Sequence, residues 1–181
     1  MRALVTGGAG FIGSNVVSLL LERGYEVAVL EDLSSGHVDN LAQEARFHEA
    51  EVRNAAAVNA AAAGCSAIFH LTASVGSKRS IDDPRRDAEV NLFGMVSVLE
   101  ATRGNGIHKV VFSSSAGIFG ELKTLPSTRT TLEIRTLPTG SASLPQRSSR
   151  WSTTSSTACT ACVCATSTST GPTNATTPMA T

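Results

Sequence analysis

The chain has 181 residues, a hydrophobic content of 41%, a charged content of 17%, and equal numbers of basic and acidic side chains, 15 of each. The net charge of the whole chain is zero because two opposite charges cancel: residues 1–126 carry a net charge of −3 and residues 127–181 a net charge of +3. Neither part is basic enough for a nucleic-acid-binding surface, and no apolar run approaches the roughly 18 to 20 residues that span a bilayer, so we expect neither nucleic acid nor membrane as a partner. The four cysteines form no pattern typical of a secreted disulfide framework, which favours a cytoplasmic protein.

Predicted strands and helices alternate through the first 126 residues. Short apolar or β-branched runs predict strands at 2–6, 26–30, 46–52, 66–71 and 109–114. Apolar side chains at helical spacing predict helices at 11–23, 55–63 and 84–103. This alternation is typical of a parallel sheet covered on both faces. The predicted fold class is therefore α/β, a Rossmann-type doubly wound parallel sheet with five recognisable strands.

The regular pattern ends near Pro126. Ser and Thr make up 26 of the last 55 residues, and no sustained apolar period of either kind is present there. Such a segment has too little apolar surface to offset the entropy lost on ordering. We therefore predict a folded domain at 1–126 and a largely disordered, low-complexity tail at 127–181.

A glycine-rich loop connects the first predicted strand to the first predicted helix, with Gly7, Gly10 and Gly13 three residues apart. Glycine permits a tight turn and a close approach of the backbone to a pyrophosphate, and the helix N-terminus offers free N–H groups to the anion. Glu31 ends the second strand 18 residues after Gly13, near the roughly 20 expected for the carboxylate that binds the adenosine ribose. An acid there favours NAD over NADP, because it would repel a 2′-phosphate.

Several spaced motifs carry a family resemblance. They are Gly7-x-x-Gly10-x-x-Gly13, Glu31-Asp-Leu-Ser-Ser-Gly36, His70-Leu-Thr-Ala73, Asn91-Leu-Phe-Gly94 and Phe112-Ser-Ser-Ser-Ala116. Together they resemble the extended short-chain dehydrogenase/reductases, and within them the NAD-dependent epimerase/dehydratase family typified by UDP-glucose 4-epimerase. The resemblance implies a Rossmann domain that binds NAD, a nucleotide-sugar substrate, transient oxidation of a sugar hydroxyl, and a possible homodimer. Two alternatives stay open: a nucleotide-sugar dehydratase, and a non-catalytic dinucleotide-binding module with an interaction tail.

The resemblance also implies which residues bind the cofactor, and in two places this chain has Glu where the family usually has Asp. The implied residues are Gly7, Gly10, Phe11, Ile12 and Gly13 around the pyrophosphate; Glu31, Asp32, Leu33, Ser34, Ser35 and Gly36 around the adenosine ribose; Glu51 and Val52 beside the adenine; and Leu71, Thr72, Ala73, Ser74, Val75 and Asn91 along the middle of the cofactor. No metal site is predicted.

Half of the family's catalytic machinery has no counterpart in this sequence. Ser115 matches the family's catalytic Ser/Thr, which hydrogen-bonds the sugar hydroxyl. The family also uses a Tyr general base, with a Lys four residues later that lowers the pKa of the Tyr. Here the single tyrosine is Tyr25, and no Lys follows Lys123. We therefore predict that the chain as written is inactive.

A shifted reading frame would restore the missing residues. If the third base of each codon is joined to the first two bases of the next, residues 164–181 permit RYFNVYGPNQRYDPYGN, which resembles the stretch after the family's sixth strand. Residues 137–143 permit PYGxSK, with Tyr four residues before Lys. We therefore expect that residues 127–181 are the remainder of the same domain, read after a single-base shift near Pro126.

Overall fold

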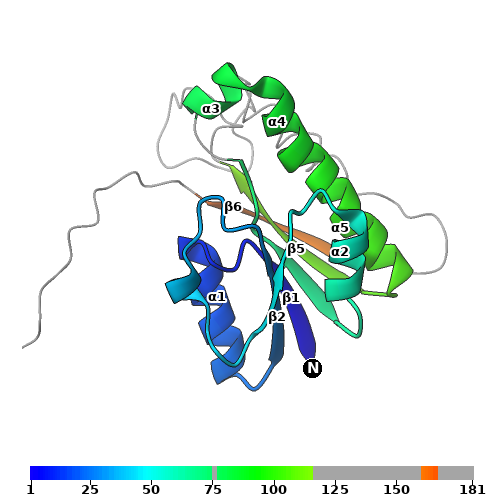
Figure 1. Ribbon diagram of the computed structural model, residues 1–181. Coiled ribbons are helices and arrows are strands. Elements are labelled where there is room, and N and C mark those ends of the chain that lie inside the picture. Colours follow the sequence, from blue (N-terminus) through cyan, green and yellow to red (C-terminus); the bar gives the residue numbers. More distant parts are fainter. Residues whose placement is uncertain (75–76, 116–159, 167–181) are drawn as a thin grey trace, which may run out of the picture.

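The computed structural model describes residues 1–74, 77–115 and 160–166, and its centre is a parallel six-stranded sheet (Figure 1). The strands lie in the order β3-β2-β1-β4-β5-β6. Their bounds are β1 (Arg2–Thr6), β2 (Glu26–Glu31), β3 (Arg46–Glu49), β4 (Ala67–His70), β5 (Lys109–Ser115) and β6 (Thr160–Thr166). The strand order changes direction between β1 and β4, and ligands of open α/β sheets bind beyond the carboxyl ends of the strands at such a switch point.

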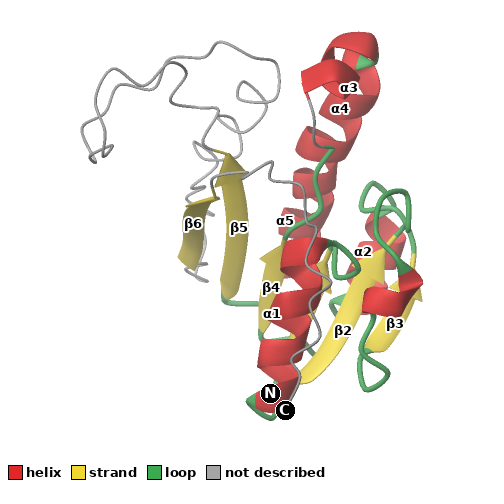
Figure 2. Cartoon of the chain, turned by 90° about the vertical axis from the view of Figure 1, so that its left-hand side faces the viewer, coloured by secondary structure: helices red, strands yellow, loops and turns green. Residues whose placement is uncertain are grey.

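Helices cover both faces of this sheet, with α1 on one face and α2 and α5 on the other (Figures 1 and 2). The helical elements are α1 (Phe11–Glu22), the 3-10 turn η1 (Val38–Asn40), α2 (Ala55–Ala61), α3 (Ser77–Asp82), α4 (Pro84–Ala88), the π-helical turn η2 (Glu89–Phe93) and α5 (Gly94–Gly104). Gly24, which follows α1, has a φ of 76°. That left-handed conformation is the reason a glycine ends the helix.

Two apolar cores lie on opposite faces of the sheet because successive side chains of a strand point to opposite sides. In β1, Leu4 belongs to the core beneath α2 and α5, whereas Ala3 and Val5 belong to the core beneath α1. All three side chains are fully buried. The central strands are therefore apolar on both faces, which leaves polar groups at their carboxyl ends to form a site.

The predicted fold class is confirmed, and the five predicted strands are present. The long helix predicted from Pro84 is divided by the π-helical turn η2, and α3 was not predicted. The structure also adds β6 in a part of the chain for which the sequence predicts no regular element. Residues 161–165 of β6 are small or apolar, and they pair in parallel register with the edge of β5. Within the tail that was predicted to be largely disordered, the structure describes residues 160–166 as β6; the rest of 116–181 lies outside the described residues.

Candidate functional site

The glycine loop leaves β1 and turns tightly against the neighbouring strands. Gly7 has a φ of 76°, and a Cβ there would lie 2.8 Å from the backbone nitrogen of Thr72. A Cβ on Gly13 would lie 2.0 Å from the carbonyl oxygen of Gly7. Both positions therefore require glycine. Gly7 needs it because of its left-handed conformation and its closeness to the segment after β4, and Gly13 needs it because helix α1 approaches the glycine loop there.

The start of α1 is open to a ligand. Its N-cap residue is Gly10, which has no side chain to bond the first-turn N–H groups. The side chain of Phe11 is 80% exposed and that of Ile12 is 44% exposed. Free N–H groups at the N-terminus of a helix favour an anion such as a phosphate.

Glu31 ties the glycine loop to the end of β2. Its Oε2 accepts a hydrogen bond from the N–H of Ala9 at 3.3 Å, and its Oε1 accepts one from the N–H of Leu33 at 3.1 Å. The side chain is buried, and this burial raises the pKa of its carboxyl above the ordinary value. Leu33 has a φ of 57°, a left-handed conformation that is uncommon for a branched side chain and costs energy.

Asp32 shapes the loop that follows β2. Its Oδ1 accepts hydrogen bonds from the backbone N–H of Ser34 at 3.0 Å and from the hydroxyl of Ser34 at 2.6 Å. Burial acts to raise the pKa of Asp32, but the bonds from Ser34 and the nearby charge of Arg86 bring it below its ordinary value. Asp32 is therefore a carboxylate at neutral pH, placed beside the loop that the sequence assigns to the ribose.

The two residues predicted beside the adenine take different positions. Val52 is 4% exposed and packs in the core against the backbone position of Gly94. Glu51 accepts a hydrogen bond from Nε of Arg53 at 2.9 Å, and Arg53 also pairs with Glu89 on η2. Arg53 and Glu89 were not among the predicted site residues. Glu51 lines a small pocket of about 280 Å³ with Asp32, Ser34, Glu49, Ala50 and Arg86.

Hydrogen bonds from the π-helical turn η2 fix the segment that follows β4. Asn91 Oδ1 accepts a hydrogen bond from the N–H of Ser74 at 2.9 Å, and Asn91 Nδ2 donates one to the carbonyl of Ser74 at 3.2 Å. The N–H of Thr72 lies 3.4 Å from the hydroxyl of Thr6. Asn91 thus fixes the backbone of the segment predicted to line the middle of the cofactor. Val75, the last residue of that prediction, lies outside the described residues.

His70 is a structural residue of the sheet. It is 1% exposed, its Nδ1 lies 2.8 Å from the hydroxyl of Thr6, and its ring stacks on Phe112 with 6.0 Å between ring centroids. Burial lowers the pKa of His70 to about 4, so the ring is neutral at physiological pH.

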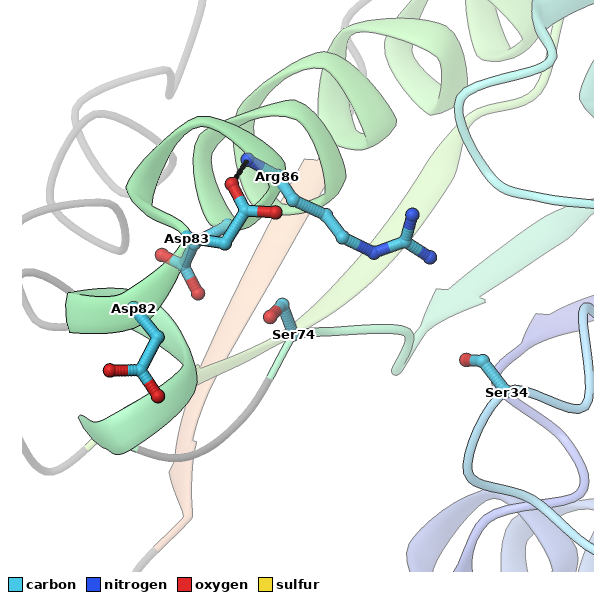
Figure 3. A pocket seen from close by; sticks show the side chains of 6 residues that line it. Ser34, Ser74, Asp82, Asp83 and Arg86 are labelled. Carbon is cyan, nitrogen blue, oxygen red and sulfur yellow. Dashed lines mark hydrogen bonds between the residues drawn. The ribbon is translucent and has the colours of Figure 1, made fainter.

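A second pocket, of about 340 Å³, lies between the loop after β2, the segment after β4, and helices α3 and α4 (Figure 3). It is lined by Ser34, Ser74, Asp82, Asp83, Arg86 and Asp87. Figure 3 shows the side chain of Arg86 extending from α4 toward the side of the pocket on which Ser34 lies. The sequence did not identify Asp82 of α3, the N-cap residue Asp83, or Arg86 and Asp87 of α4, since none of them belongs to a motif.

Ser115, the predicted catalytic serine, is the last residue of β5. It pairs in register with Thr166 of β6, but its side chain lies outside the described part of the chain. Tyr25 lies between α1 and β2, at the end of the sheet opposite the glycine loop, and packs against the core beneath α1. Among the described residues, no cluster of His, Cys, Asp or Glu could hold a metal ion. Within residues 1–74, 77–115 and 160–166, no helix is long and apolar enough to cross a membrane.

Comparison with known proteins gives a consistent result. The model of the NAD dependent epimerase/dehydratase family matches residues 3–177. UDP-glucose 4-epimerase of Mycolicibacterium smegmatis is 45% identical over 134 residues, which cover 70% of this chain and 43% of that protein. The chain therefore spans less than half the length of this curated relative.

Solved structures agree with the sequence comparison. UDP-glucose 4-epimerase of Thermotoga maritima with UDP-glucose matches with a TM-score of 0.78 and 37% identity, over 82% of this chain and 49% of that one. The enzyme of Thermus thermophilus in complex with NAD matches with a TM-score of 0.76 and 37% identity, again over 82% and 49%. At these identities the likeness extends beyond the fold to the family.

Proposed function

This chain belongs to the NAD-dependent epimerase/dehydratase family, and from that premise we propose that it is the cofactor-binding half of a nucleotide-sugar epimerase of the UDP-glucose 4-epimerase type. The observation that carries the proposal is the hydrogen bond from the N–H of Ala9 to Glu31. It joins the glycine loop to the predicted ribose loop, so that the sites for the pyrophosphate and for the adenosine ribose are held together.

The described residues fit NAD. The close approaches at Gly7 and Gly13 form a cradle that a Cβ would fill, next to the uncapped N-terminus of α1. The carboxylates of Glu31 and Asp32 can accept hydrogen bonds from the two ribose hydroxyls, and their charge disfavours the 2′-phosphate of NADP. The segment 71–74, fixed by Asn91, would lie along the middle of the cofactor.

The reaction that we propose for the complete enzyme is a reversible oxidation at one sugar carbon. NAD, which would be held by the glycine loop, by Glu31 and Asp32 and by the segment 71–74, would supply the hydride acceptor for this oxidation. The hydroxyl of Ser115 would hydrogen-bond the reacting sugar hydroxyl. Proton removal needs a base near that hydroxyl, and Tyr25 lies at the opposite end of the sheet, so the chain as written would bind NAD without turnover.

We propose further that residues 1–126 are the first part of the cofactor domain and that residues 127–181 are its continuation in a shifted frame. The position of β6 supports this division, because residues 160–166 extend the sheet next to β5, directly where the shifted frame begins to permit the family-like segment. Sequencing the coding DNA across residues 122–129 tests it. If DNA sequenced from an independent template contains no inserted or deleted base in this region, the proposal is wrong.

Two assays test the function. Calorimetric titration of the full 181-residue chain with NAD should give one binding site, and NAD should raise the thermal midpoint, because a ligand that binds only the folded state stabilises it. Incubation with UDP-galactose should give no UDP-glucose. Absence of NAD binding contradicts the cofactor assignment, and turnover contradicts the predicted inactivity of the chain as written.

A further inference from the structure

The backbone around Glu51, two residues after the end of β3, is fixed on both sides. The N–H of Ala50 donates a hydrogen bond to the carbonyl of Glu31 at 3.0 Å, and the carbonyl of Glu51 accepts one from the N–H of Asn54 at 3.0 Å. Val52, the next residue, is buried in the core. The fold therefore fixes the main chain at Glu51, and the side-chain torsions decide where its carboxylate lies.

A single guanidinium holds that carboxylate by one of its two oxygens. Nε of Arg53 donates a hydrogen bond to Oε2 of Glu51 at 2.9 Å, and Nη2 of Arg53 donates a second one to the same oxygen. Oε1 of Glu51 has no hydrogen-bond partner among the described residues. One oxygen is thus held by the protein, and the other is left to accept a hydrogen bond from a ligand.

Glu89 of η2 anchors the same guanidinium from the opposite side. Nη1 of Arg53 pairs with Oε2 of Glu89, and Oε1 of Glu89 accepts a hydrogen bond from Nε of Arg85 at 3.1 Å. The side chains of Arg53 and Glu89 are each 29% exposed, and that of Arg85 is 89% exposed. Ion pairs so open to water contribute little to stability. The consequence of this network is therefore the orientation that it gives to Arg53 and, through Arg53, to Glu51.

Glu51 lines the 280 Å³ pocket together with Asp32 and Ser34 of the loop assigned to the ribose. The family resemblance places the adenine of the cofactor beside Glu51. The exocyclic amino group of adenine is a donor, and a carboxylate oxygen is an acceptor. The turn η2 also carries Asn91, which fixes Ser74 in the segment predicted to line the middle of the cofactor. One turn therefore anchors two separate parts of the cofactor site.

The length of the Glu51 side chain makes its orientation important. This chain has Glu where the family usually has Asp, and the additional methylene adds one rotatable bond. A side chain with more rotamers loses more entropy when a ligand fixes it. Because Arg53 already holds Oε2, part of that entropy is lost in the free protein. Such preorganisation increases the affinity for the group that the side chain recognises.

We propose that Arg53 is a positioning residue for recognition of the cofactor's base: anchored by Glu89, it holds Oε2 of Glu51 so that Oε1 accepts a hydrogen bond from the exocyclic amino group of the adenine. The inference rests on the proposed function, namely that the chain binds NAD. It assigns no contact with the cofactor to Arg53 or Glu89, because both act through Glu51.

The test compares NAD with nicotinamide hypoxanthine dinucleotide, which has a ring carbonyl where NAD has the amino group and carries the same phosphate charges. Calorimetric titration of the full chain should show about tenfold or greater preference for NAD, the size expected for a hydrogen bond to a charged acceptor. Arg53→Gln should reduce that preference about two- to tenfold, because the ligand must then order the side chain of Glu51. Arg53→Lys, which keeps the charge but loses the fork of donors, should give an intermediate preference.

Arg2→Gln is the matched control for these variants. Nε and Nη2 of Arg2 both donate to Oε2 of Glu26, at 3.1 and 2.6 Å, which is the same arrangement as that between Arg53 and Glu51. This pair lies at the amino ends of β1 and β2, at the opposite end of the sheet from the pocket. Arg2→Gln should therefore keep the wild-type preference between the two dinucleotides.

Each outcome decides the matter. Equal affinity of the wild-type chain for the two dinucleotides overturns the inference and leaves NAD binding intact. An unchanged preference in Arg53→Gln also overturns it, even if both dinucleotides bind more weakly, since a merely structural role predicts that result. If Arg53→Gln does not fold, Glu89→Gln, which removes the charge that anchors Arg53, should lower the preference, and an unchanged preference there is equally decisive. Failure of the wild-type chain to bind NAD at all overturns both the proposed function and this inference.

Discussion

Asn91 and Ser74 form a two-sided pair in which the side-chain amide bonds both the N–H and the carbonyl of one backbone residue, at 2.9 and 3.2 Å. The pair joins the π-helical turn η2 to the segment after β4. Turns of this kind occur often at functional sites, where they redirect a side chain. Here the turn aligns the amide of Asn91 with a segment that lies 17 residues earlier in the chain.

Replacement of Asn91 by Ala should destabilise the protein by about 1 to 3 kcal/mol, because both backbone groups of Ser74 lose their partner in a poorly hydrated place. The affinity for NAD should fall as well, since the segment 71–74 is no longer fixed. Urea unfolding and calorimetry measure the two effects. Asn59→Ala, a control on α2, loses only a solvent-exposed hydrogen bond from Asn105 and should change stability by less than about 0.5 kcal/mol. Unchanged stability of Asn91→Ala would contradict the anchoring role.

Alanine substitution in the glycine loop should separate folding from ligand binding. A Cβ on Gly13 meets a backbone oxygen at 2.0 Å and cannot be accommodated, so Gly13→Ala should cost about 3 kcal/mol or more. A Cβ on Gly10 comes only within 3.4 Å of the same oxygen, so Gly10→Ala should fold like the wild type. The Gly10 variant should nevertheless bind NAD more weakly, because its methyl group lies at the predicted pyrophosphate site. Thermal unfolding with and without NAD distinguishes the two variants.

Acid should destabilise the protein through His70. Burial lowers the folded-state pKa of His70 to about 4 from an ordinary value of 6.5, so between these values the unfolded chain takes up a proton that the folded chain does not. The stability contributed by the neutral ring is complete above pH 6.5 and falls as the pH drops toward 4, by at most about 3 kcal/mol.

Glu31 acts in the opposite sense, because its raised pKa favours proton uptake by the folded state. The variant His70→Gln isolates the histidine contribution and should flatten the pH dependence of the urea midpoint between about pH 7.5 and 5. His37→Gln, which changes an exposed histidine, should leave the dependence unchanged. An equally steep dependence in His70→Gln would contradict the assignment.

Restoring the shifted frame should restore catalysis. A gene with one base inserted or deleted near the codon for Pro126, so that the shifted frame is read, would encode Tyr and Lys four residues apart, in the order that the family requires. Because the chain spans less than half the length of its curated relative, the product should interconvert UDP-glucose and UDP-galactose where the restored frame also encodes the remaining half of the enzyme, whereas the chain as written should not. A coupled assay for UDP-glucose compares the two proteins at equal concentration. An inactive product that still binds NAD would argue against the epimerase proposal.

The sequence predicted those parts of the fold that local patterns determine. The strands of the first 115 residues lie within a few positions of their predicted bounds, because most of them are short apolar runs next to a turn signal; β3, which is mostly polar, is the exception. Helix α3 could not be predicted, since its sequence is polar and its one large apolar residue, Ile81, is 64% exposed. Residues 160–166 form a strand only because β5 presents an edge to pair with, which no local pattern reveals.

The sequence proposes site residues where a motif has a fixed chemical meaning and misses pocket residues that only tertiary packing brings together. The spacing of Gly7, Gly13 and Glu31, together with the strand and helix predicted around them, led to the prediction that they bind the cofactor, and the structure shows the close backbone approaches at both glycines. The burial of Asp87 depends on how α4 lies over two loops that are distant in sequence. The ion pair between Arg53 and Glu89 likewise spans 36 positions in the chain. Pairs of this kind follow from the fold and cannot be read from neighbouring residues.

The order of the strands has a consequence for folding kinetics. Arg2 of β1 pairs with Glu26 and Ala3 pairs with Ala67, whereas β6 begins at Thr160 opposite Lys109 of β5. Contacts between positions close in the chain form sooner, and synthesis proceeds from the N-terminus. The five strands β1 to β5 can therefore assemble while the last part of the polypeptide is still being synthesised. A nascent chain would possess its dinucleotide cradle before β6 exists, and the final strand would add to an already folded edge.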